Sequence, residues 1–178
     1  MRLLPLACVV LGMSCALAPG LANASLIGCD AFMDKLRAEA RDLQIDFSHA
    51  LIVSRAKSDS EVFDISTKME VDGTLTCRHD EFARFEVHLA EPASARATTA
   101  FERLNASALR AALGWDSGKS HGEAQAMASD AKEFLAASRE RGDVYIAGKT
   151  EEHVPGGVSL GLIYTDVDRA FAIVGPQE

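Results

Sequence analysis

The densest group of residues that could bind a metal ion or transfer a proton is His79-Asp80-Glu81, and His121 is a separate candidate. A catalytic zinc site needs about three protein ligands on a rigid frame. The histidines are spread along the chain, and none of them has the H-x-x-x-H spacing that places a pair on one helix face. We therefore predict no metal site and no cofactor. These residues support only an alternative prediction, a small periplasmic hydrolase with a histidine and acid site near residues 114–122.

Gly118-Lys119-Ser120 has the glycine, lysine and serine of a phosphate-binding loop. That loop begins with a further glycine in the pattern G-x-x-x-x-G-K-S, but Leu113 occupies its place. The fragment is therefore predicted to be a solvated loop between helices. A catalytic triad is assembled in space rather than along the sequence. Ser120, with His121 beside it, is accordingly not assigned as a nucleophile, and we predict no catalytic residue.

Trp115 is the only tryptophan of the chain, and it falls in the glycine-flanked segment at residues 114–122 that we predict to be a loop. A tryptophan in such a position could line a ligand cleft or anchor a partner. The competing interpretation is that it covers the hydrophobic core, which the burial statistics of tryptophan favour. Trp115 is the first of the residues that we predict to form a ligand or partner surface.

The elements that would position these residues follow from residues 63–89, where apolar side chains occupy most odd positions and polar side chains the even ones. Side chains alternate between the two faces of a strand, so this pattern predicts an antiparallel meander with one buried and one exposed face. Asp72-Gly73 predicts a tight hairpin turn. Residues 78–83 predict a second, looser turn.

The exposed face of this meander is predicted to carry polar side chains that could contact a partner. Together with Trp115, the candidate ligand or partner surface consists of Lys68, Glu70, Arg78 and His88.

The remaining sequence predicts helices before and after this meander, and then more strands. Amphipathic periodicity predicts helices at 30–43, 94–113 (with a break near 105–107) and 123–141, capped by Asp30 at the first start and Gly142 at the last end. Short strands are predicted at 49–55, 144–149, 158–165 and 170–174, with a polar loop at 56–61. The predicted fold class is α+β: an antiparallel meander sheet with amphipathic helices packed on one face and one disulfide, forming a single domain at residues 25–178.

The first 24 residues predict a secretory signal peptide. Arg2 precedes an apolar run too short to span a bilayer, and small residues follow at the expected cleavage site. Leu26-Ile27-Gly28-Cys29 resembles a bacterial lipobox, which makes a lipid anchor at Cys29 the alternative. We favour export without an anchor, because Cys29 and Cys77 are the cysteines left after cleavage and would form one disulfide in an oxidising compartment.

The chain is acidic, with a formal net charge of −8. Because no basic cluster stands out, we predict no nucleic-acid partner, and no later apolar run predicts a membrane span. Without a catalytic motif, the sequence predicts an exported, periplasmic, non-catalytic module that binds an unknown protein or small-molecule partner. A further alternative is an envelope chaperone- or inhibitor-like module that adds a strand at an open sheet edge.

Overall fold

The computed structural model describes residues 27–55, 58–143 and 147–176, and for residues 49–55 and 58–59 only the backbone. The predicted signal peptide, the start of the mature chain at residue 25 and the first lipobox residue lie outside these ranges. Within them the chain forms α1 (Cys29–Glu39), the 3-10 turn η1 (Arg41–Leu43), β1 (Asp46–Arg55), β2 (Ser58–Ser66), β3 (Asp72–Arg78), β4 (Glu81–Ala90), α2 (Ala95–Leu113), α3 (Ser117–Arg141), β5 (Ala147–Val154), β6 (Val158–Thr165) and β7 (Asp168–Val174).

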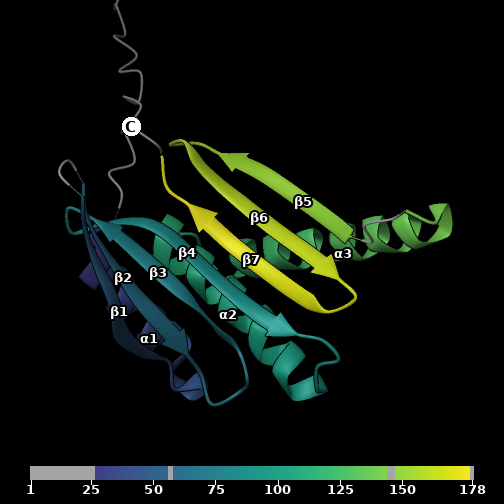
Figure 1. Ribbon diagram of the computed structural model, residues 1–178, viewed down its shortest axis with the longest axis horizontal. Helices are drawn as coiled ribbons and strands as arrows, with labels where there is room; N and C mark the ends of the chain where they lie inside the picture. The colour runs from purple at the N-terminus through teal and green to yellow at the C-terminus, as the bar shows by residue number, and fades with distance from the viewer. Residues whose placement is uncertain (1–26, 56–57, 144–146, 177–178) are drawn as a thin grey trace, which may run out of the picture.

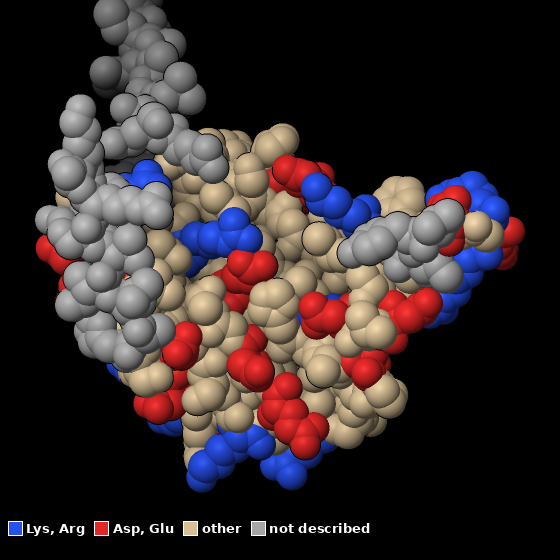
Figure 2. Space-filling model, viewed as in Figure 1, with Lys and Arg blue, Asp and Glu red and all other residues tan. Residues whose placement is uncertain are grey.

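The described strands form one antiparallel sheet of seven strands in the order β1-β2-β3-β4-β7-β6-β5. The three described α-helices lie behind the sheet in Figure 1, so they cover one sheet face, and no described helix covers the other, here called the open face. The predicted α+β fold, with an antiparallel sheet and helices on one face, is therefore confirmed. Figure 2 shows the open face, on which acidic and basic side chains are interspersed with uncharged surface. The strands at the edges are β1 and β5, which the sequence could not identify.

The buried face of the meander follows the predicted alternation. Phe63, Ile65, Leu75, Phe85 and Val87 are all buried beneath the helices. The alternation fails at an even position, Phe82, which is only 1% exposed. A β-bulge explains the exception, because the pairing shifts from Thr76–Arg84 to Cys77–Phe82 and turns Phe82 inward. There its ring lies 4.7 Å from that of Phe32 on α1.

The predicted hairpin at Asp72-Gly73 is wrong. The turn between β2 and β3 spans residues 67–71 and is closed by Thr67, whose hydroxyl donates to the Val71 carbonyl at 3.1 Å. Gly73 lies within β3, where an added Cβ would overlap the Glu86 carbonyl oxygen of β4. The glycine therefore serves a close approach of two strands rather than a turn. The predicted polar loop at 56–61 is also too long, since β2 starts at Ser58 and pairs with β1.

The helix boundaries differ from the prediction at their starts. α1 begins one residue earlier, with Gly28 rather than Asp30 at the N-cap position. α3 begins at Ser117, within the segment predicted to be a loop, because the Asp116 carboxylate accepts a hydrogen bond from the Lys119 N–H at 2.9 Å.

Other helix predictions have mixed outcomes. α2 runs unbroken through residues 105–107, which are buried. Gly142 ends α3 in the left-handed conformation, as predicted. β5 extends to Val154, beyond its predicted end at residue 149, and residues 144–146 lie outside the described ranges.

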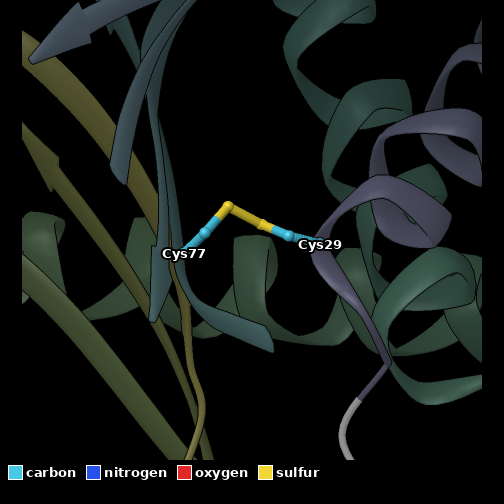
Figure 3. Close-up of a disulfide and its surroundings, with 2 residues drawn as sticks. All are labelled: Cys29 and Cys77. Carbon is cyan, nitrogen blue, oxygen red and sulfur yellow. A yellow bond between two sulfur atoms is a disulfide. The ribbon is translucent and has the colours of Figure 1, made fainter. Parts of the chain in front are cut away.

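Cys29 and Cys77 pair as a disulfide, with their Cα atoms 5.9 Å apart. Figure 3 shows the bond joining the first turn of α1 to β3. Backbone bonds reinforce this junction: the Cys29 N–H donates to the Asp80 carbonyl at 2.8 Å, and the Phe82 N–H donates to the Ile27 carbonyl at 3.1 Å. The disulfide predicted from the cysteine count is therefore present, and with these bonds it fixes the start of α1 to the end of the β3–β4 hairpin.

Candidate binding cleft at Trp115

Trp115 occupies the short connection between α2 and α3. Gly114 ends α2 with φ of 65°, a left-handed conformation that glycine adopts without strain. The Asp116 cap then starts α3 immediately after the tryptophan. The tight connection holds the indole half-buried against the core.

A cleft of about 340 Å³ opens beside this indole. Its walls come from the segment before α1, from α1, from the end of α2 and start of α3, and from the β5–β6 hairpin. Most of the surface is apolar, and the lining residues are Ile27, Lys35, Ala111, Ala112, Leu113, Gly114, Trp115, Lys119, Val154, Pro155 and Val158. Its volume is at the lower end of the range for small-molecule pockets, about 300–1,000 Å³.

The charged groups at this cleft are Lys35 on α1 and Lys119 on α3. The Lys119 ammonium lies 4.0 Å from the centroid of the Trp115 ring, which is a cation–π contact. No Asp or Glu is among the described lining residues, and neither lysine forms an ion pair with a described carboxylate. The cleft is therefore locally positive in a chain whose net charge is −8.

Two carboxyl groups, those of Glu123 and Glu152, interact with each other near Lys119. Glu123, one turn after Lys119 on α3, shares a hydrogen bond with Glu152 of β5, and this bond, burial and the Glu152 charge raise the pKa of Glu123 from 4.5 to about 7. The nearby Lys119 charge lowers the pKa in part, and Asp130 raises it further. Below about pH 7 the pair therefore holds a shared proton, which links the first part of α3 to β5.

The predicted surface residues do not gather at this cleft, except for Trp115. Lys68 and Glu70 are exposed in the β2–β3 turn, and Arg78 is exposed at the opposite end of β3. His88 lies on the open face of β4, where its ring nitrogens approach Glu86 at 3.4 Å and Asp168 at 3.3 Å. The even positions of Lys68, Glu70, Arg78 and His88 predicted that they share the exposed face of the sheet. Position along the sequence did not predict how far apart they lie on it.

The candidate acids and histidines are divided between two places. His79, Asp80 and Glu81 are exposed at the β3–β4 turn, where His79 and Asp80 have φ of 51° and 65°. His121 instead lines a second cleft of about 380 Å³ between the helices, which none of the other three lines. The condition for a hydrolase, convergence of at least two of these side chains in one pocket, is not met in this cleft or in the Trp115 cleft.

The second cleft differs from the Trp115 cleft in how its charges are compensated. Arg110 is paired with Glu39, and Arg103 donates to Asp42 at 2.6 Å. Glu102 lies 3.9 Å from the Lys132 ammonium. Because these charges are already matched within the protein, a ligand would have to displace existing ion pairs there.

The glycine-rich segment of α3 contains one more pattern. Gly118-Lys119-Ser120-His121-Gly122 also matches G-x-S-x-G, the nucleophile elbow, which sequence reasoning missed. An elbow needs a strand before the turn and an exposed serine, whereas here the segment follows α2 and Ser120 is 0% exposed. The Ser120 hydroxyl donates to the Asp116 carbonyl at 2.8 Å inside the first turn of α3. The segment forms neither an elbow nor a phosphate-binding loop.

The described part of the chain also lacks a cluster of metal ligands and a membrane-spanning helix. There, no three His, Cys, Asp or Glu side chains gather in an arrangement that could hold a metal ion. No described helix is both long enough and apolar enough to cross a bilayer.

Comparison with known proteins gave no match to any protein-family model, curated protein or solved structure.

Proposed function

We propose that this protein is an exported, non-catalytic binding module whose ligand site is the Trp115 cleft. The observation that carries the proposal is the cleft itself, a concave apolar surface of about 340 Å³ assembled from several separate segments around a half-buried tryptophan. Concave, mostly apolar surfaces with a few polar groups are where small ligands bind. The ligand contributes an apolar body that packs against Trp115, Leu113 and Val158.

The proposed site of action is the bacterial periplasm. The Cys29–Cys77 disulfide supports this, since such bonds persist in oxidising compartments. It also uses the thiol that a lipid anchor at Cys29 would need, which favours export without an anchor. The leader-like residues 1–24 give independent support from the sequence.

Intrinsic fluorescence tests the proposed binding site directly, because Trp115 is the only tryptophan. We expect ten-carbon alkyl compounds to change its emission in a saturable way, whatever their headgroup. Calorimetric titration would supply the stoichiometry. The blocking variant is Ala112→Phe, which places a ring in the cleft from a partly buried position.

The matched control is Ala136→Phe, the same substitution at an exposed position of α3 that does not line the cleft. We expect the control to bind as the unmodified protein does and Ala112→Phe to lose binding. Thermal unfolding of both variants establishes that each is folded. If no alkyl compound binds, or if the folded Ala112→Phe variant binds normally, the Trp115 cleft is not the ligand site.

A further inference from the structure

We infer that the Trp115 cleft takes an amphiphile with a carboxylate headgroup, which Lys35 and Lys119 bind while the apolar body enters the cleft. This inference rests on the proposed function and adds the chemical class of the ligand. It follows from the charge of the lining: its titratable side chains are lysines, and the rest is apolar or backbone.

Charge complementarity favours an anion over a neutral or cationic headgroup. Neither lysine forms a salt bridge with a described carboxylate, although Lys119 still attracts Glu123, whereas the arginines of the second cleft are paired with Glu39 and Asp42. An unpaired ammonium beside an apolar wall is less well compensated than one in a surface ion pair, so an incoming carboxylate gains attraction without breaking an internal bond. The protein as a whole is acidic, so this positive site is local.

The position of the lysines favours a headgroup at one side of the cleft and an apolar body inside it. Lys35 and Lys119 are exposed, and they project from α1 and α3. Leu113 and Trp115 are half-buried, and Val154 and Val158 are buried. A lysine can lay its alkyl stem along apolar surface and keep its ammonium group in water. An amphiphile would match this division, with its carboxylate at the exposed ammonium groups.

The experiment compares three probes with the same ten-carbon chain: decanoate, 1-decanol and decyltrimethylammonium, each below the concentration at which micelles form. We expect decanoate to bind about tenfold more tightly than decanol, and decyltrimethylammonium to bind most weakly. Raising the salt from about 50 mM to about 500 mM should weaken decanoate binding and leave decanol binding unchanged. Affinity is measured by calorimetry, because a change in the Lys119–Trp115 contact would itself alter the fluorescence of Trp115.

Lysine variants locate the headgroup. Lys35→Met and Lys119→Met should each weaken decanoate binding up to about fivefold, the effect of losing one partly exposed ion pair, with decanol affinity unchanged. Lys132→Met is the matched control, because Lys132 lies on α3 outside the cleft and should leave both affinities unchanged.

The outcomes separate the ligand class from the site. If decanol and decanoate bind equally well, and Ala112→Phe abolishes both, the cleft is a ligand site but the carboxylate inference is wrong. If Lys35→Met and Lys119→Met weaken decanol as much as decanoate, the lysines act through packing, which also overturns it. Absence of binding by every probe overturns both the inference and the proposed function.

Discussion

Replacing Glu123 with glutamine should make the protein less sensitive to alkaline pH. The hydrogen bond to Glu152, burial and the Glu152 charge raise the pKa of Glu123 from 4.5 to about 7. A carboxyl group with a raised pKa in the folded state binds its proton more tightly there than in the unfolded chain. Its contribution to stability is therefore fully present below pH 4.5 and is lost as the pH rises through about 7.

The magnitude follows from the size of the pKa difference and from solvent exposure. A rise from 4.5 to about 7 corresponds to roughly 3 kcal/mol for a fully buried group, at about 1.4 kcal/mol for each tenfold change. Glu123 is only half-buried, so water screens much of this interaction, and we expect about 1 kcal/mol. Glutamine would donate a hydrogen bond to the Glu152 carboxylate at every pH and carry no charge.

The assay is urea unfolding followed by circular dichroism at several values between about pH 5 and pH 8. Glu123→Gln should match the unmodified protein near pH 5 and exceed it by about 1 kcal/mol near pH 8. Taking the difference between the proteins at each pH removes the contribution of the histidines. Glu133→Gln, at an exposed position of the same helix, is the control and should give no pH-dependent difference. An unchanged pH dependence in Glu123→Gln would refute the shared proton.

Replacing both disulfide cysteines with serine should lower the free energy of unfolding by up to about 4 kcal/mol, since the bond closes a loop of 48 residues, and a reducing agent should then have no further effect in urea titrations. Gly148→Ala should destabilise the protein by about 2 kcal/mol, because its Cβ would overlap the backbone of α3, whereas Gly161→Ala, with open space around it, should change the midpoint little. Arg169→Met should lower the free energy of unfolding by about 3 kcal/mol, because it leaves the mostly buried Glu91 carboxylate without its ion-pair partner. Adding Glu91→Gln should recover part of that stability in urea titrations, and no recovery would contradict the pairing.

The buried face of the sheet could be predicted because strand alternation is a local property. Phe63, Leu75 and Val87 needed no knowledge of their neighbours to be assigned to one face. The misplaced hairpin has a different cause. A glycine after an aspartate is typical of a turn, but the same residue type is also required where two backbones approach closely, as at Gly73. Sequence alone does not distinguish the two requirements.

The early start of α3 shows the same competition between local signals. Three glycines within residues 114–122 favoured a loop. Asp116 supplies the cap that starts the helix, and Ser120 is buried within its first turn. Gly118 and Gly122 have a low helix propensity, but propensity contributes less to helix stability than tertiary packing does. Capping and burial therefore outweighed it. Trp115 was predicted to lie in a long loop, but its setting is a tight interhelical connection.

The positive charge of the cleft could not be predicted from sequence, because it depends on which partner the carboxyl group of Glu123 bonds. In sequence, Lys119 and Glu123 have the i,i+4 spacing of a helical ion pair, which would cancel the lysine charge. In the folded protein the Glu123 carboxyl instead shares its hydrogen bond with Glu152, a residue of β5 distant in sequence. Lys119 forms no salt bridge with a described carboxylate, although its charge still lowers the pKa of Glu123, and its ammonium packs over Trp115 at the cleft. The property that would select an anionic ligand thus arises from the packing of α3 against β5.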